Sequence, residues 1–402
     1  MLMFGSVVLV AAAGLLAVPV LVFATEIFAA LFARRGGSTP PEYLTPRPRV
    51  AVLVPAHNEG AGLVPTLSDV MIQILPGDRI LVVADNCTDE TATIAAAAGA
   101  EVVERCDPAR RGKGYALDYG VRHLASDPPS VLVVVDADCR LGTDAIARLA
   151  RICAATQSPA QAEYVMTPPL NATVNYRVAE FAWRVKNTLR PSGLAVLGLP
   201  CQLMGTGMAF PWGAIRSANL AHGHIVEDLK LGLELATAGY PPLFCPTACV
   251  RSQFPHSTEG ARHQRERWEH GHIDVILRAV PRLLGAAVRR RNWPLLVLTL
   301  DAAVPPLSLL VLLMVGMVLF SALASLAGIS VVALSISLLS FGVLSAAVLL
   351  AWWTCGSDVL PARALPSILA YVVRKFGSYC RALSGRSAMP WLRTERREGD
   401  KL

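Results

Sequence analysis

The sequence predicts an α/β domain flanked by membrane-spanning helices. Apolar residues make up 53% of the 402 residues, and the mean hydropathy of +0.45 is high for a soluble protein. This apolar excess lies near the two ends of the chain. Between them, short apolar runs alternate with helical stretches, a pattern typical of a doubly wound sheet.

The N-terminal apolar run extends from Leu2 to Phe32, with Glu26 as its only charge. It exceeds the roughly 20 residues needed to cross a bilayer, is too long for a signal peptide, and lacks a basic leading segment. Arg34 and Arg35 follow the run. Because basic residues stay on the cytoplasmic side, residues 1–35 are expected to be a transmembrane anchor with its N-terminus outside.

Residues 293–355 are expected to form a transmembrane hairpin, with spans over about 294–326 and 329–353 joined at Gly328. Asp301 falls near the start of the first span, where a charge can still reach the interface. Residues 356–402 carry an apolar but basic stretch, 365–383, which predicts an interfacial helix followed by a cytoplasmic tail. The chain is thus predicted to be a multi-pass protein of the inner (plasma) membrane.

The net charge and the cysteines also limit which compartments and partners are expected. The nine cysteines are scattered without a CxxC pair, as expected for reduced cysteines in a cytoplasmic domain. The net charge of +7 comes from basic residues clustered beside the predicted spans. Anionic lipid headgroups explain this excess better than a nucleic acid does. Membrane lipids are therefore expected partners, and nucleic acid is not.

Residues 36–256 are expected to form the cytoplasmic α/β domain. Its predicted strands are 50–54, 79–84, 101–104 and 131–135, and its predicted helices are 60–74, 88–98, 115–124 and 223–239. Polar clusters follow three of the strands, at 55–59, 85–89 and 136–138. Ligands of such sheets bind beyond the carboxyl ends of the strands, so these clusters are expected to converge on one edge.

Asp136 and Asp138 follow the most apolar of these strands. Side chains alternate along a strand, so both carboxylates should point to the same side. Their repulsion is tolerable if a cation lies between them, and Mg²⁺ or Mn²⁺ prefers carboxylate and phosphate oxygens. An isolated D-x-D is often only a solvated strand end. The three converging clusters instead favour a nucleotide diphosphate held by a divalent cation, with Lys113 as a candidate phosphate contact.

Two predicted helices carry further candidates. Glu227 and Asp228 fall in the first turn of the 223–239 helix, where acidic residues often only complement the helix dipole. In the helical region 257–292, Gln264, Arg267 and Trp268 share one face. Such a face can bind a diphosphate and stack on a sugar ring. An amphipathic helix on the membrane surface is the alternative.

Together these motifs resemble a known family. VPAHNE, ADNCTDET, RRGKGYAL, VDAD, VEDLKLGLEL and QRERW follow one another between about residues 48 and 275. This order resembles the membrane-bound family 2 glycosyltransferases of the D,D,D,QxxRW type, which include bacterial exopolysaccharide transferases and the cellulose and hyaluronan synthases. The resemblance implies a GT-A fold, a Rossmann-like mixed sheet, flanked by transmembrane α-helices.

The resemblance also implies roles for single residues. On the donor side it implies nucleotide-sugar binding by Glu59, Asp85, Lys113, Asp136, Gln264 and Arg267. The metal, Mg²⁺ or Mn²⁺, would be bound directly by Asp138 and supported by Asp136. Asp228 would be the general base, with Glu227 as the next candidate. Trp268 would border the acceptor.

The implied reaction is inverting transfer of a hexosyl or N-acetylhexosaminyl group, expected from a UDP-sugar, to a lipid-linked or polysaccharide acceptor in exopolysaccharide or cell-surface glycan synthesis. Other polysaccharide-assembly proteins are candidate partners. A processive synthase and a non-catalytic nucleotide-binding sensor are the alternatives. Val226 replaces the usual Thr of T-E-D, and Gly205-Thr206-Gly207 stands where many processive members carry Cys-Gly-Ser/Thr. Because of these departures, the resemblance does not identify the acceptor.

Overall fold

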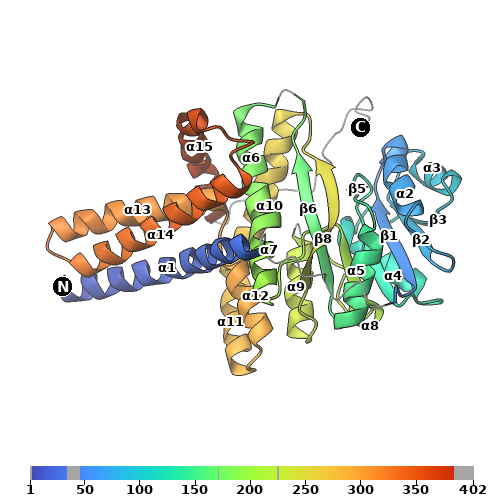
Figure 1. Cartoon of the computed structure of the whole chain (residues 1–402), viewed down its shortest axis with the longest axis horizontal. Coiled ribbons are helices and arrows are strands. Elements are labelled where there is room, and N and C mark those ends of the chain that lie inside the picture. Colours follow the sequence, from blue (N-terminus) through green and yellow to red (C-terminus); the bar gives the residue numbers. More distant parts are fainter. Residues whose placement is uncertain (1, 34–45, 171, 224–225, 384–402) are drawn as a thin grey trace.

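The computed structural model describes residues 2–33, 46–170, 172–223 and 226–383, and its centre is a mixed sheet (Figure 1). The strand order is β3-β2-β1-β4-β7-β6-β8-β5. The strands are β1 (Val50–Ala56), β2 (Arg79–Asp85), β3 (Glu101–Arg105), β4 (Val131–Val134), β5 (Arg140–Leu141), β6 (Ala160–Thr167), β7 (Met208–Pro211) and β8 (Leu243–Gln253).

The sheet has a parallel half and a mixed half. Strands β3, β2, β1 and β4 are parallel, as their order along the sequence predicts. Strand β7 runs antiparallel to both β4 and β6, while β6 and β8 are parallel to each other. The alternation of strand and helix anticipated only the parallel half.

Strand β1 shows how the sheet forms two cores. Val50, Val52 and Val54 belong to one hydrophobic cluster, and Ala51 and Leu53 belong to another, because successive side chains point to opposite faces. On the first face the sheet packs against α2 (Val64–Met71), α3 (Thr91–Ala97) and α5 (Ala145–Thr156). On the second it packs against α4 (Lys113–Leu124) and α9 (Glu227–Thr237). Burial on both faces explains the near-continuous apolar strands.

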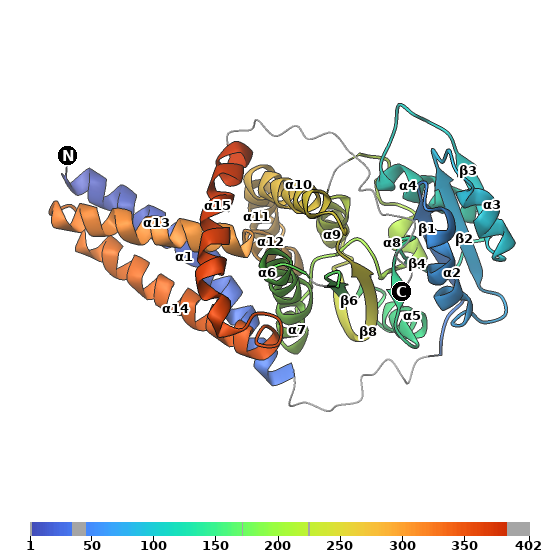
Figure 2. The same cartoon turned by 90° about the horizontal axis from the view of Figure 1, so that it is seen from above.

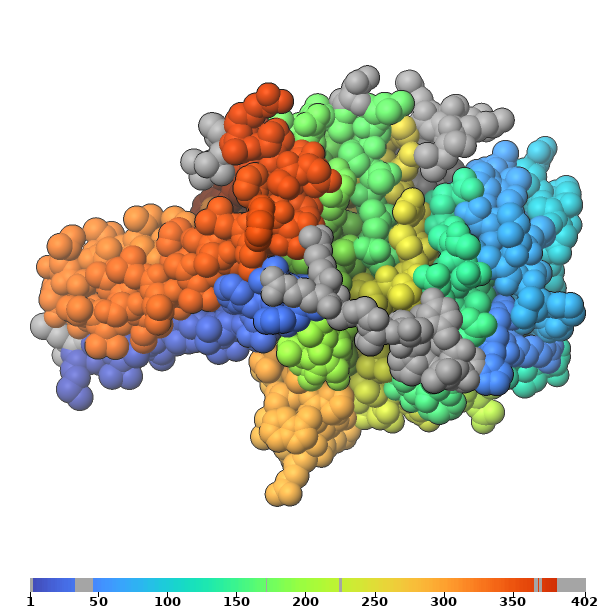
Figure 3. Space-filling model, viewed as in Figure 1, coloured from blue at the N-terminus to red at the C-terminus, as the bar shows by residue number. Residues whose placement is uncertain are grey.

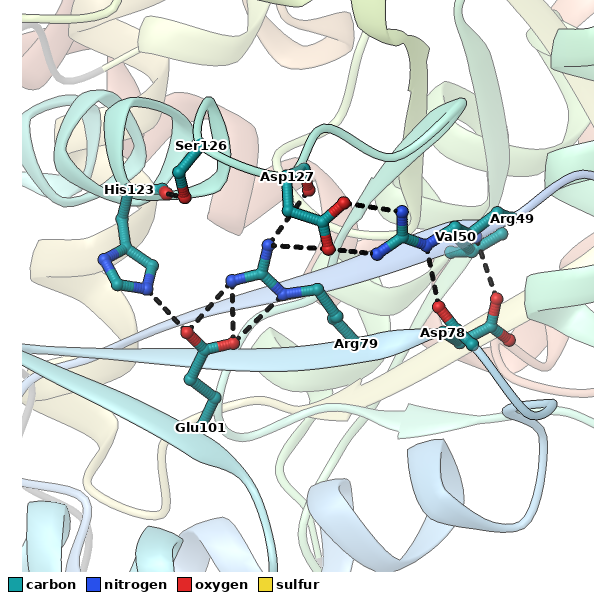
Figure 4. A network of polar contacts seen from close by, with 9 residues as sticks. Arg49, Val50, Asp78, Arg79, Glu101, His123, Ser126 and Asp127 are labelled. Carbon is teal, nitrogen blue, oxygen red and sulfur yellow. Dashed lines mark hydrogen bonds and ion pairs between the residues drawn. The ribbon is translucent and has the colours of Figure 1, made fainter.

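At the amino ends of the parallel strands, charged side chains are paired with one another (Figure 4). Arg49 binds Asp127, Arg79 binds Glu101 at 2.9 Å, and the Val50 N–H donates to Asp78 at 2.8 Å. Exposed pairs of this kind each contribute little stability, about 0–1 kcal/mol. They pair the charges at this edge of the sheet with one another.

Further helices complete the sheet domain and the region beside the apolar helices. They are η2 (Gly60–Leu63), α6 (Val174–Arg184), η3 (Val185–Leu189), α7 (Arg190–Val196), α8 (Trp212–Ile215), α10 (Thr258–Arg278), α11 (Val280–Arg289), α12 (Trp293–Ala302) and η4 (Ala362–Ala364). Helices α6, α7 and α10 lie between the sheet and the long apolar helices in both views (Figures 1 and 2).

Three helices are long and apolar enough to cross a membrane: α1 (Leu2–Ala33), α13 (Leu307–Leu326) and α14 (Val331–Cys355). They run side by side and project from the rest of the molecule (Figures 2 and 3). Large apolar side chains on them remain exposed, among them Phe4, Leu319 and Trp353. Such exposure is compatible with contact with lipid, since soluble surfaces rarely carry contiguous apolar patches of this extent.

The expected span over about 294–326 is divided, which corrects the predicted hairpin. Pro305 and Pro306 lie between α12 and α13, and proline cannot donate the backbone hydrogen bonds that would continue a helix. Helix α12 packs on α9 and α11 instead of joining the bundle. Asp301, expected near the interface, is buried and paired with Arg190. The hairpin therefore begins at Leu307.

The predicted C-terminal helix is present as α15 (Leu365–Leu383), which lies across the base of the apolar bundle (Figures 1 and 2). It contacts α10 through the pair of Lys375 with Glu269 and the hydrogen bond of His270 with Ser378. Arg34, Arg35 and the tail beyond residue 383 lie outside the described residues.

Candidate active site

Asp136 and Asp138 lie at the carboxyl edge of the sheet, just beyond β4. The strand ends at Val134, so the two residues occupy the turn that follows and are not part of the strand itself. Three atoms lie within 4.8 Å of one another here: one carboxylate oxygen of Asp136, one carboxylate oxygen of Asp138 and the sulfur of Cys139. The turn thus brings the two carboxylates together as the sequence predicted, although the backbone is not extended.

Lys113 joins this pair from the first turn of α4. Its ammonium donates to the Asp136 carboxylate and, at 2.7 Å, to the Gly205 carbonyl. Burial raises the pKa of Asp136, and the Lys113 charge opposes that rise. Burial alone would lower the pKa of Lys113, but the surrounding carboxylates outweigh it and hold that pKa above its ordinary value. Lys113 therefore stays charged beside Asp136.

The segment Gly205-Thr206-Gly207 connects the carboxylate pair to α9. The Thr206 hydroxyl accepts the Asp136 N–H at 3.0 Å, and Gly205 has a φ of +92°, which favours glycine. A Cβ at Gly205 would lie 3.4 Å from Asp228 Oδ2. Gly207, at φ +61°, is equally constrained, since a Cβ there would lie 2.7 Å from Val250. The loop therefore approaches both Lys113 and Asp228.

Glu227 and Asp228 form the first turn of α9. Burial raises the pKa of both carboxyls. The neighbouring Asp228 adds to the rise at Glu227, whose pKa reaches about 8. At Asp228 the positive charge of Lys186 counters the burial. The ionised state needed of a general base is thus better supported at Asp228 than at Glu227.

Helix α10 presents Gln264, Arg267 and Trp268. Burial lowers the pKa of the Arg267 guanidinium, and the negative charge of Glu227 opposes that change. The Trp268 ring lies 5.3 Å from that of Trp183, and Trp268 packs against the sheet core. Part of the indole therefore anchors α10, and contact with the acceptor stays a prediction. The Gln264 amide oxygen is buried with no hydrogen-bond partner among the described residues.

The two residues predicted at the nucleoside lie at the ends of other strands. Asp85 ends β2 and is paired with Arg105 at 2.5 Å. Arg105, which ends β3, also lies over the Tyr115 ring at 5.3 Å. The Glu59 N–H donates to Thr91 at 2.9 Å. The sequence analysis missed Arg105, although a charged residue at the end of a strand was the signal that could have revealed it.

The carboxylate pair suits a hard divalent cation. Burial raises the pKa of the Cys139 thiol well above its ordinary value, and hard cations such as Mg²⁺ prefer oxygen to sulfur ligands. The donor set is then Asp136 and Asp138, which matches the way Mg²⁺ is held by one or two carboxylates plus substrate phosphates. Within the described part of the chain, no other group of three His, Cys, Asp or Glu residues approaches this closely.

Residues 46–271 match the family described as "Glycosyltransferase like family 2". The chain belongs to this family. It is 27% identical over 247 residues to the probable glycosyltransferase YdaM of Bacillus subtilis, covering 58% of this chain and 57% of that protein. It is also 43% identical over 89 residues to an uncharacterised glycosyltransferase of Mycobacterium tuberculosis, covering 22% and 36%. The chain thus spans about half the length of the curated relatives it matches.

Among solved structures, a mannosyltransferase from Pyrobaculum calidifontis in complex with GDP-mannose and Mn²⁺ is similar to this family 2 chain. The match has a TM-score of 0.52 and 18% identity, and covers 94% of this chain and 100% of the other. This likeness establishes the fold, and the predicted mixed α/β GT-A-like architecture is confirmed.

Proposed function

We propose that the protein is a membrane-anchored, inverting, metal-dependent glycosyltransferase. It transfers a hexosyl or N-acetylhexosaminyl group from a nucleotide-sugar, expected to be a UDP-sugar, to a lipid-linked or polysaccharide acceptor in exopolysaccharide or cell-surface glycan synthesis. One observation carries the proposal. The Gly205-Thr206-Gly207 loop contacts Lys113 and the Asp136 backbone and also approaches Asp228. Donor and acceptor functions therefore meet in one site.

On the donor side, Asp136 and Asp138 would hold Mg²⁺ or Mn²⁺. When bound, the cation supplies positive charge that stabilises the leaving diphosphate. Arg267 and Gln264 of α10 bind the same diphosphate, and Lys113 supports it from α4. Glu59 and Asp85, at the ends of neighbouring strands, bind the nucleoside. The mannosyltransferase of similar fold was solved with GDP-mannose and Mn²⁺, which supports this assignment.

On the acceptor side, Asp228 accepts the proton of the attacking hydroxyl. The hydroxyl oxygen forms a bond to the anomeric carbon while the bond from that carbon to the diphosphate breaks. The nucleoside diphosphate leaves, and the configuration at the anomeric carbon is inverted. General-base assistance of this type contributes about 10²–10⁴-fold to the rate. A small pocket whose lining includes Lys113, Glu227, Asp228 and the apolar side chains Leu117, Met208 and Leu231 lies beside the base.

The apolar helices support a location in the inner membrane with the catalytic domain in the cytoplasm, where nucleotide-sugars are made. A single-addition transferase fits three candidate spans better than a processive synthase, which also needs a path for the polymer. Asp228 at the site argues against a sensor without turnover. Trp268 is assigned to the acceptor side.

The test is to incubate membranes containing the full chain with a panel of radiolabelled nucleotide-sugars and to size the product. Incorporation of one sugar into a lipid-extractable product supports single addition, and a ladder or high-mass product supports the processive alternative. Absence of incorporation from every donor, under conditions where each donor binds, contradicts the proposed function.

A further inference from the structure

Thr66 joins α2 to the turn that carries the two candidate metal ligands. Its hydroxyl donates to the Ala137 carbonyl at 2.8 Å and to the Cys139 carbonyl at 2.7 Å. A threonine hydroxyl has a single proton, so the two carbonyls share it. Thr66 is 1% exposed, and Ala137 and Cys139 are buried as well. These hydrogen bonds are therefore shielded from bulk water.

The contact differs from the one that a buried threonine commonly makes inside a helix. Such a hydroxyl can donate to the carbonyl one turn earlier in its own helix. Thr299 of α12 does so, donating to the Leu295 carbonyl at 2.6 Å. Thr66 instead donates to carbonyls that lie 71 and 73 positions further along the chain. Its hydroxyl thus holds α2 against the turn.

The two acceptors of Thr66 lie on either side of Asp138, the residue assigned to the metal. Each carbonyl belongs to a planar peptide unit, so fixing the carbonyl fixes the orientation of that unit. The Thr66 hydroxyl therefore restrains the backbone both before and after Asp138. The direction in which the Asp138 carboxylate leaves the turn depends on this restraint.

Other contacts hold the two ends of the same segment. One turn further along α2, Asp69 accepts the Leu141 N–H at 3.0 Å and pairs with Arg140 at 2.7 Å. At the start of the segment, the Thr206 hydroxyl accepts the Asp136 N–H at 3.0 Å. The ends of the turn are thus anchored by two other elements. Thr66 supplies the anchor in the middle, where Asp138 lies.

An anchored turn favours cation binding for an electrostatic reason. Two neighbouring carboxylates repel each other, and a turn that could move would relieve the repulsion by separating them. A cation would then have to draw the carboxylates together again, which weakens its binding. Groups that fix the orientation of metal ligands remove this cost.

We propose that Thr66 is a positioning residue for the metal site. Its hydroxyl holds Asp138 in the orientation from which the carboxylate binds the divalent cation, and it acts through the Ala137 and Cys139 carbonyls. This inference rests on the proposed function and adds to its metal site a residue outside the motifs of the sequence. Removal of the hydroxyl should therefore weaken metal binding before it affects any other property of the site.

The test measures Mn²⁺ binding to the full chain in lipid nanodiscs by electron paramagnetic resonance, with UDP or GDP present, whichever the wild-type protein binds. Thr66→Val keeps the shape of the side chain and removes the donor, and it should weaken Mn²⁺ binding about tenfold or more. Thr66→Ser keeps the hydroxyl and should restore binding to within about twofold of the wild type. Thr299→Val is the matched control, because it removes an equally buried hydroxyl whose hydrogen bond stays within α12.

Unchanged Mn²⁺ affinity in Thr66→Val would overturn the inference, even if thermal unfolding in EDTA showed the variant to be less stable. A purely structural role lowers stability and leaves the Mn²⁺ affinity of the folded protein unchanged. An equal loss of affinity in Thr299→Val would also overturn the inference. Absence of Mn²⁺ binding by the wild-type protein would contradict the metal site of the proposed function itself, so the two failures are distinguishable.

If Thr66→Val does not fold, Thr66→Cys takes its place. A thiol is a weaker donor than a hydroxyl, so Thr66→Cys should bind Mn²⁺ more weakly than Thr66→Ser. Equal Mn²⁺ affinities of these two variants would then overturn the inference.

Turnover supplies a second readout once a donor is identified. In Thr66→Val the Mn²⁺ concentration that gives half the maximal rate should rise about tenfold or more, and saturating Mn²⁺ should restore most of the rate. An unchanged Mn²⁺ requirement together with a lower kcat would contradict the proposal.

Discussion

At the scale of single residues, the site depends on how its acidic groups are balanced by cations. Lys113 donates a hydrogen bond to the Asp136 carboxylate. At Asp228, the positive charge of Lys186 is the strongest charge that opposes the rise in pKa caused by burial. Glu227 lies beside Asp228, and burial raises its pKa to about 8. A pKa near 8 leaves much of Glu227 protonated at neutral pH, so Glu227 is the weaker candidate for the group that accepts the acceptor proton.

Asp228→Asn tests this assignment, since it keeps the shape of the side chain and removes the base. We expect kcat to fall about 10²–10⁴-fold. The affinity for the nucleotide-sugar, measured by calorimetry, should change little because the donor contacts lie on Asp138, Lys113 and Arg267. Glu227→Gln serves as the matched substitution on the same turn. Retained turnover in Asp228→Asn together with a loss in Glu227→Gln would move the base to Glu227.

Local sequence motifs were enough to predict most of the candidate site residues. A carboxylate pair after an apolar strand, an acidic first turn and a QxxRW face can all be read within short windows. Lys186 and Arg105 could not be found in this way. Each acts through a partner far away in sequence, Asp228 for Lys186 and Asp85 for Arg105. These interactions arise from the tertiary structure, which a single sequence does not display.

At the scale of elements, the loop between α7 and β7 connects the two parts of the candidate site. Gly205-Thr206-Gly207 departs from the pattern of processive relatives, and the sequence alone could not tell whether this affected the site. The structure shows a buried Thr206 held by the Asp136 N–H and by Gln161, which donates to the Thr206 carbonyl at 2.9 Å. The loop is therefore part of the site.

Gly205→Ala tests the loop, with Gly198→Ala as its control. Both glycines have positive φ, +92° and +67°, so both substitutions should destabilise the fold by roughly 1 kcal/mol. Only at Gly205 would the new methyl approach the site, 3.4 Å from Asp228 and 3.8 Å from Lys113, whereas nothing lies within 4 Å at Gly198. Turnover per folded molecule should fall in Gly205→Ala alone. Equal activity of the two variants would exclude the loop from the site.

Strand β7 and helix α12 differ from the sequence prediction for separate physical reasons. Strand β7 is short and pairs antiparallel with β4, so no crossover helix announces its place in the sheet. Helix α12 is as apolar as a membrane span, but the prolines before α13 separate it from the bundle. Hydropathy measures the apolar content of both helices and does not register the break.

At the scale of the whole molecule, charged contacts join the membrane helices to the catalytic domain. Glu26 of α1 and Asp301 of α12 both pair with Arg190 of α7, and all three residues are buried. A Cβ at Gly193 would lie 1.9 Å from the Glu26 carbonyl, so α1 and α7 touch through their backbones. Buried ion pairs and a close backbone contact therefore join the candidate membrane helix α1 to α7 and α12.

The arrangement of the bundle leads to a prediction of topology. The start of α1 lies beside the turn between α13 and α14, where a Cβ at Gly5 would be 3.6 Å from Ile329. Both should lie outside if the catalytic domain is cytoplasmic. A reporter active only in the cytoplasm should be active when fused after Leu402 and silent when inserted at Gly328. The opposite pattern would refute the three-span orientation.

The central claim, that Asp136 and Asp138 perform metal-dependent sugar transfer, is tested most directly by the metal requirement of turnover. The full chain is stripped with EDTA, and transfer from the nucleotide-sugar is followed as Mn²⁺ or Mg²⁺ is added back. We predict no transfer in EDTA and full recovery with the cation in the wild-type protein. Asp138→Ala should not recover at any concentration that saturates the wild type. Full turnover in EDTA, or normal recovery of Asp138→Ala, would contradict the account.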